Sequence, residues 1–206
     1  MRIREMLAVV AIAGMLGCEG GEALLPLAEG DGITFRYAGA ASGSHESVGE
    51  VRVGGDGFPA AGDWAIARPD SLGGLVIAGF ESTGESTGNL FVLQIPDQEA
   101  RQYTCTLHGT DGGCHGSLFL GVDLEDPAAA GEVFQVVSGS ATIAELGSGR
   151  LRGSFTLELR EGGEGGATLQ VSEGELDLEF DDDVTLANGI ACLARNLMEG
   201  TNERCL

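Results

Sequence analysis

The stretch GRLRGSFTLELREGGEGGATLQVSEGELDLEF, residues 149–180, contains two runs in which apolar and polar side chains alternate. The apolar residues of one face are Leu151, Phe155, Leu157 and Leu159 in the first run and Leu176, Leu178 and Phe180 in the second. A period of two is the pattern of a strand with one buried and one solvated face. Glu175, Asp177 and Glu179 make the solvated face of the second run anionic. The glycines of 160–167 predict a flexible loop between the runs, so the stretch predicts a β-hairpin.

Shorter runs of the same kind precede this hairpin, separated by glycine, serine, aspartate and proline. They are ITFRYA (33–38), GEVRV (49–53), WAIAR (64–68), GLVIAGF (74–80), NLFVLQI (89–95), QYTCTLH (102–108), SLFLGV (117–122) and EVFQVVSGSATIAEL (132–146). Short strands at this spacing, without long helices between them, are typical of a β-sandwich or a barrel. We predict a mostly β protein with an antiparallel β-sandwich over residues 33–183 and one C-terminal α-helix.

Residues 184–206 have a different period, which predicts this helix. Its apolar residues, at spacings of four, three and four, are Leu186, Ile190, Leu193 and Leu197. Such spacing places them on one helical face. Asp183 or Thr185 is the candidate N-cap, and Gly200 is the candidate end of the helix. We expect the helix to pack against the sandwich and a disulfide to close the tail behind it.

The N-terminus has the order of an export signal. Arg2 and Arg4 are followed by the apolar run 6–16 and by the small residue Gly17. The run is too short to cross a bilayer, which takes about 20 apolar residues. It has the length of the apolar region of a secretory signal instead. We therefore predict a signal peptide over residues 1–17.

Leu16, Gly17 and Cys18 resemble the lipobox of bacterial lipoproteins, with Met15 where that pattern usually has leucine. The resemblance implies cleavage before Cys18 and acylation of this residue, so that a lipid on Cys18 anchors the chain to a membrane. Residues 18–32 would then form a tether. The implied location is the bacterial cell envelope outside the cytoplasm, at the outer membrane or the cell surface.

A second resemblance covers roughly residues 33–180. The residues that carry it are Ser138, Gly139, Ile143, Gly153, Ser154, Phe155, Gly174 and Leu176. They look like a pattern common in uncharacterised bacterial lipoproteins, in which three such strands end a secreted β-sandwich domain. The resemblance implies a fold and a location in the cell envelope, and it implies no catalytic activity.

The charge balance of the chain narrows the choice of partners. The sequence has 32 acidic residues against 11 arginines and no lysine, which gives a formal net charge of −21. A charge of this sign argues against nucleic acid and anionic membrane surfaces as partners. Acidic residues also permit calcium binding, and Asp181-Asp182-Asp183 is a candidate run. The spacing and glycine of an EF-hand are missing there, so a solvated link before the helix is the simpler interpretation.

Four cysteines remain once Cys18 is assigned to the lipid. An even set in an exported chain predicts disulfides, and four cysteines allow three connectivities. The simplest joins Cys105 to Cys114 and Cys192 to Cys205. The sequence between the first two conflicts with this pairing, because a two-residue turn at Asp111-Gly112 would place Cys105 about 13 Å from Cys114. If the disulfide forms, 106–113 must be a wider loop.

Other chemistries find weaker support. Cys105, His108, Cys114 and His115 could hold zinc, but their spacing is cramped and exported thiols tend to oxidise. HESVG at 45–49 starts like a zincin helix but has Gly49 in place of the second histidine. No G-x-S-x-G motif is present. The aromatic residues Trp64, Tyr37 and Tyr103 fall in predicted strands, where core positions are more usual than a sugar-binding platform.

These patterns predict a non-catalytic envelope lipoprotein of structural or adhesive type, with no cofactor and no metal site. The alternative is a ligand-binding module, with calcium dependence as one option. The sequence names no protein or glycan partner, and an enzyme ranks third.

Overall fold

The computed structural model describes residues 32–51, 62–109, 112–124, 126, 131–162, 165–181 and 184–200. Its elements are β1 (Gly32–Gly39), β2 (Gly43–Val48), β3 (Trp64–Pro69), β4 (Leu75–Ser82), β5 (Thr87–Ile95), β6 (Gln102–Thr106), β7 (His115–Asp123), β8 (Glu132–Gly147), β9 (Arg150–Glu161), β10 (Thr168–Glu179) and α1 (Val184–Glu199). The predicted signal peptide, and the predicted tether up to Asp31, lie outside the described residues.

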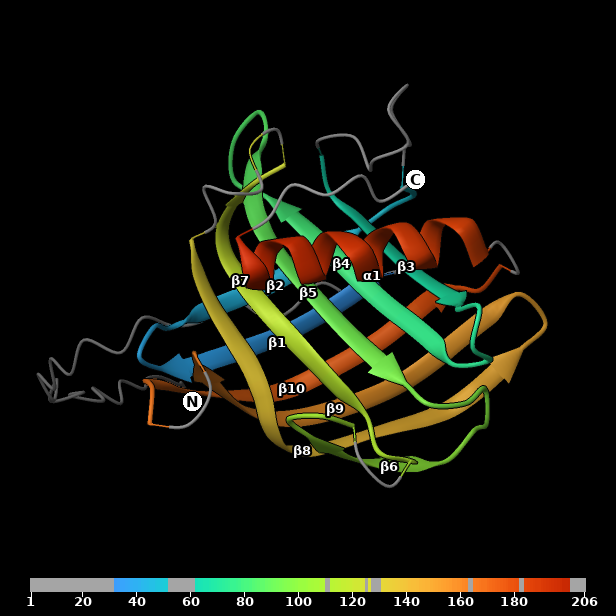
Figure 1. Cartoon of the computed structure of the whole chain (residues 1–206). Coiled ribbons are helices and arrows are strands. Elements are labelled where there is room, and N and C mark those ends of the chain that lie inside the picture. The colour runs from blue at the N-terminus through green and yellow to red at the C-terminus, as the bar shows by residue number, and fades with distance from the viewer. Residues whose placement is uncertain are drawn as a thin grey trace, which may run out of the picture.

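All ten strands belong to one antiparallel sheet, in the order β2-β1-β10-β9-β8-β7-β5-β4-β3, with β6 paired to β8. The mostly β, antiparallel prediction with a C-terminal helix is therefore confirmed. The expected sandwich of two separate sheets is not what the chain forms, because this single sheet is nearly closed and barrel-like (Figure 1). Its curvature follows from long strands with bulges: β8 has 16 residues and irregular register at two places, and β10 is irregular between Val171 and Gly174.

The ends of the strand order meet without forming a full ladder. The Ala65 amide in β3 donates to the Gly49 carbonyl just after β2 (3.1 Å), and Ala67 forms an isolated parallel bridge with Phe180 just after β10. The predicted strand 49–53 is wrong, since β2 ends at Val48 and residues 49–51 are not in a strand. Residues 52–53 lie outside the described part of the chain.

Two apolar cores lie on the two sides of this sheet. The inner core fills the barrel, and the outer one lies between β3, β4, β5, β7 and α1, which crosses these strands in Figure 1. In β4, Leu75 and Ile77 belong to the inner core, whereas Val76, Ala78 and Phe80 belong to the outer one. Burial on both faces explains why GLVIAGF reads as a continuous apolar run and not as an alternating one.

Helix α1 uses the predicted face. Leu186, Ile190, Leu193 and Leu197 are all buried, and Gly200 follows the helix with φ of 62°. Such a positive φ suits glycine at the end of a helix. Thr185 lies inside the helix and so is not its N-cap, and Asp183 is outside the described residues.

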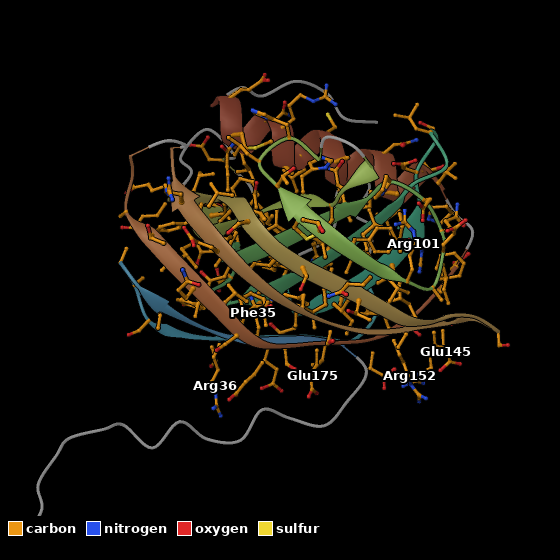
Figure 2. All side chains as sticks on the ribbon, turned by 90° about the horizontal axis from the view of Figure 1, so that it is seen from below. Phe35, Arg36, Arg101, Glu145, Arg152 and Glu175 are labelled. Atoms are coloured by element: carbon orange, nitrogen blue, oxygen red, sulfur yellow. A yellow bond between two sulfur atoms is a disulfide. The ribbon has the colours of Figure 1, made fainter. Side chains whose placement is uncertain are left out.

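The β9–β10 hairpin forms as predicted, with Thr168 opposite Arg160 and Leu178 opposite Leu151. Its outer face is charged but not uniformly anionic. The ion pairs on this face include Arg36–Glu173 (2.8 Å), Arg152–Glu145 (3.5 Å), Arg152–Asp177 (3.3 Å), Arg160–Glu158 (3.1 Å) and Arg150–Asp177. Figure 2 shows Arg36, Glu145, Arg152 and Glu175 pointing outward from the sheet, whereas Phe35 lies on the inner side. Arginines on β1 and β9 therefore offset part of the negative charge.

Candidate functional site

The candidate site is a polar cluster inside the barrel, centred on His45 of β2. A strand directs alternate side chains to opposite faces, so His45 and Ser47 both point inward, opposite Phe35 and Ile33 of β1. Both side chains have an exposed fraction of 0%. Because both inward residues are polar, β2 lacks the apolar alternation by which the other strands are recognised in the sequence.

The imidazole of His45 has one hydrogen-bond partner among the described residues. Its Nε2 atom lies 3.1 Å from Ser47 Oγ, and its ring stacks on Phe35 with a centroid separation of 4.7 Å. The other nitrogen, Nδ1, is buried without a hydrogen-bond partner and lies 3.8 Å from Glu81 Oε2. That distance is too long for a hydrogen bond but short enough for a charge interaction.

Glu81 of β4 joins several strands through its carboxylate. Its Oε1 accepts a hydrogen bond from the Glu46 amide of β2 (3.4 Å), and its Oε2 accepts one from Asn89 Nδ2 of β5 (3.1 Å). The Oδ1 atom of Asn89 in turn accepts from the Gly121 amide of β7 (3.1 Å). This chain of hydrogen bonds links β2, β4, β5 and β7 along one rim of the barrel.

Burial controls the protonation of the cluster. It lowers the pKa of His45 to about 3, so the imidazole is neutral at pH 7. It also raises the pKa of Glu81, an effect that the hydrogen bonds from Asn89 and the Glu46 amide oppose. The carboxylates of Asp63 and Glu46 raise the pKa of Glu81 further. The pKa of Tyr37 is raised by burial and by the charge of Glu81.

Ser47, His45 and Glu81 stand in the order of a nucleophile, a base and an orienting carboxylate. Ser47 cannot act as a nucleophile in this arrangement, because a substrate has no route to its Oγ atom. That atom packs against the backbone of Gly79 so closely that a Cβ atom at position 79 would overlap it. The geometry therefore describes a packed polar contact between β2 and β4 and not an open catalytic centre.

The predicted cysteine pair Cys105 and Cys114 is joined by a disulfide with a Cα separation of 4.3 Å. The Thr106 amide donates to the Cys114 carbonyl (2.9 Å), and the Cys114 amide donates to the Thr104 carbonyl (3.0 Å). Cys114 thus bridges to Cys105 and not to Gly109, as the disulfide requires, and positions 110 and 111 lie outside the described residues. Both sulfurs are consumed by the disulfide, so the alternative of a zinc site with His108 and His115 fails.

Other predicted positions are only partly described. Cys192 of α1 is disulfide-bonded, and its predicted partner Cys205 lies outside the described residues, as does Cys18. Of the aspartate run, Asp181 is described and lies 3.5 Å from Arg68. Nowhere in the described ranges do three histidine, cysteine or acidic side chains gather closely enough to hold a metal ion.

The aromatic residues occupy core positions, as expected. Trp64 and Tyr103 are each 1% exposed, and Tyr37 is half-buried. The hydroxyl of Tyr103 lies within hydrogen-bond distance of two acceptors, the Asp97 carboxylate and the Glu99 carbonyl, and the Arg101 guanidinium lies 4.2 Å from the centre of its ring. These contacts tie the β5–β6 connection to the barrel.

Two surface cavities lie away from the His45 cluster. One, of about 420 Å³, is next to Arg68, whose guanidinium already donates to the Glu179 carbonyl (3.3 Å) and pairs with Asp181. The other, of about 300 Å³, is on the outer face of β8, β9 and β10. Its polar lining consists of Ser140, Thr142, Ser154, Thr156, Glu173 and Glu175.

Comparison with known proteins adds no relative. No family model, curated protein or solved structure matches the chain. Within the described ranges, the helix falls short of the length and apolarity needed to cross a membrane. The sequence pattern and the described side chains are therefore the basis of the proposal below.

Proposed function

We propose that this protein is a bacterial cell-envelope lipoprotein of non-catalytic, structural or adhesive type. A lipid on Cys18 would hold the chain to the membrane, and residues 18–32 would connect this anchor to the β domain. The ordered export signal and the lipobox-like residues Leu16-Gly17-Cys18 support the anchor. The sequence resemblance of Gly153, Ser154 and Phe155 to a pattern in uncharacterised bacterial lipoproteins supports the class of protein, although the fold is barrel-like and not the sandwich that this resemblance implies.

The burial of Ser47 and His45 is the observation that favours a non-catalytic role. Among the described residues, these two and Glu81 are the serine, histidine and carboxylate that come together in the order of a hydrolytic triad. Ser47 and His45 are fully buried, whereas Glu81 is partly exposed, and the burial of the serine and histidine argues against this arrangement as a site for a substrate. A structural or adhesive role needs no such site, because it rests on the exposed surface of the domain.

Substitution of Cys18 tests the anchor. We expect Cys18→Ser to move the protein from the membrane pellet to the soluble fraction, since the acylated sulfur is lost. Met15→Leu is the matched control, because it restores the usual lipobox residue and should leave the protein in the pellet. If Cys18→Ser stays in the pellet as the unchanged protein does, the anchor is wrong.

An activity assay tests the non-catalytic role separately. The purified full-length chain should not hydrolyse chromogenic esters or peptides above the buffer rate. Turnover that disappears in both Ser47→Ala and His45→Ala would show that the buried cluster opens to substrates, and would end the non-catalytic proposal.

The cavity of about 300 Å³ favours a ligand-binding module as the second candidate. Four hydroxyl groups and the carboxylates of Glu173 and Glu175 line it, and such oxygen atoms suit calcium or a hydroxyl-rich ligand. Glu173 is already paired with Arg36, which reduces its availability. A rise in melting temperature with calcium that Glu175→Gln abolishes would favour this second function over the first.

A further inference from the structure

Strand β2 is fastened differently on its two edges. One edge forms a regular ladder with β1 from Gly43 to Val48. Toward β4, the structure shows one hydrogen bond from β2 among the described residues, from the Glu46 amide to Glu81 Oε1. The rest of this contact is the packing of Ser47 against Gly79 and the approach of His45 to Glu81. The Glu81 carboxylate thus accepts the hydrogen bond that a backbone carbonyl of a neighbouring strand would accept in a regular sheet.

This fastening depends on a neutral His45. The imidazole is enclosed by Phe35 and Phe91, whose ring centroids are 4.7 and 6.4 Å from its own. A proton added to the ring would place a cation among these aromatic side chains, where water cannot solvate it. The nearest compensating charge is Glu81 Oε2, at 3.8 Å.

Glu81 cannot move to neutralise the positive charge of a protonated His45 without releasing β2. Its two oxygens already accept hydrogen bonds from the Glu46 amide and from Asn89. Movement of the carboxylate toward a protonated His45 would lengthen the bond to the Glu46 amide, which is already 3.4 Å. The other titratable groups that face the pair are Tyr37 on β1, Glu46 on β2 and Asp63 before β3. None of these residues carries a positive charge, so none opposes proton uptake.

We propose that β2 is an acid-released strand: proton uptake at the His45–Glu81 pair detaches β2 from β4 and uncovers the cluster of Phe35, Phe91 and Phe155, while the rest of the sheet stays folded. The centroids of these three rings are 5.0 to 5.6 Å apart, with one pair stacked, one tilted and one edge-on. Strands β8, β9 and β10 should stay closed, because their inward side chains are apolar and pair through long ladders.

Hydrogen exchange of the full-length chain at pH 7.5 and pH 5.0 tests the proposal, after correction for the intrinsic exchange rates. The detached strand accepts a proton near the ordinary histidine pKa, so acidification increases its population. Detachment from β4 releases the Glu46 amide from Glu81, whereas the amides of β2 that pair with β1 keep their ladder. We expect protection of the Glu46 amide to fall about tenfold, and that of residues 151–159 to stay unchanged. Two results with the unsubstituted chain would overturn the proposal. One is an equal loss of amide protection at Glu46 of β2 and in residues 151–159, and the other is no loss of protection at Glu46.

Two variants identify the group responsible. His45→Phe keeps an aromatic ring in contact with Phe35 and should abolish the loss of protection at pH 5.0. His115→Phe is the matched control, because His115 is a second histidine whose pKa is lowered by burial, although it is only partly buried, and it lies on β7 away from the pair. It should leave the acid-induced loss in place. A loss that persists in His45→Phe would contradict the proposal.

Discussion

The side chain of Ser47 lies where a Cβ atom on residue 79 would have to be, so glycine at position 79 is what allows β2 to pack directly on β4. Ser47 belongs to the strand at one end of the sheet order, and Gly79 lies on β4, next to the strand at the other end. The near-closure of the barrel therefore depends on the absence of a side chain at one position.

This contact predicts a specific double-mutant result. Gly79→Ala should lower the free energy of unfolding by about 1–3 kcal/mol, because the added methyl group forces β2 away from β4. Ser47→Gly in the same chain vacates the place that the methyl group needs and should recover most of that loss. Denaturant unfolding of the two single variants and the double variant measures the coupling. Strictly additive effects would show that the two residues do not constrain one another.

The tyrosine at the β5–β6 connection predicts a loss of stability in alkali. Burial first, and then the carboxylate of Asp97, raise the pKa of Tyr103 to about 12. In the unfolded chain this hydroxyl loses its proton near pH 10. The protonated hydroxyl of Tyr103 therefore adds to the free energy of unfolding below pH 10, and this contribution is lost between pH 10 and pH 12. Full loss amounts to about 3 kcal/mol. Tyr103→Phe should flatten the decline of stability over this interval, measured by denaturant unfolding at each pH.

Absorbance titration of the tyrosines provides an independent check. The chain has two tyrosines, and Tyr103→Phe leaves Tyr37 as the one that titrates. The difference between the two titration curves should have its midpoint well above pH 10. A midpoint at the ordinary tyrosine pKa would mean that Asp97 and burial do not hold the proton.

The elements that the sequence predicts best are those with one buried face, because their apolar residues then recur with the period of the strand or of the helix. The β9–β10 hairpin and the buried face of α1 agree with the structure because each has one apolar face, and alternation or helical spacing reveals it directly. The disulfide between Cys105 and Cys114 also agrees. In contrast, closure of the sheet depends on bulges in β8 and β10 and on contacts between distant strands, which no local pattern encodes.

The His45 cluster shows why the candidate site was harder to predict. GSHESV has no apolar residue before its last position, so the sequence pattern predicts a strand at 49–53, directly after the true strand β2. Period two alone would have put His45 and Ser47 on one face. Their burial follows from the fold, since Phe35, Gly79 and Glu81 come from two other strands. A histidine two residues from a serine in a polar strand was the available signal.

The disulfide predicts a stability difference between two cysteine variants. Cys105 and Cys114 are nine residues apart in sequence, and closing a loop of this size stabilises a fold by about 2–3 kcal/mol. The double change Cys105→Ser and Cys114→Ser should lower the free energy of unfolding by that amount. Thiol counting on the unreduced, unfolded chain should find no free thiol. Two reactive thiols that are absent from the double variant would contradict the pairing.

The contact between α1 and the sheet predicts unequal effects for two residues on opposite faces of the helix. Ile190 is fully buried against the outer core, whereas Arg195 is exposed. Ile190→Ala removes buried methyl groups and leaves a cavity, so it should lower the free energy of unfolding by about 2–4 kcal/mol. Arg195→Ala should change it by no more than about 0.5 kcal/mol. Because α1 covers β3, β4, β5 and β7, Ile190→Ala should also increase amide exchange in β4 before it increases exchange in β9. Equal destabilisation by the two variants would mean that the helix does not bury this face.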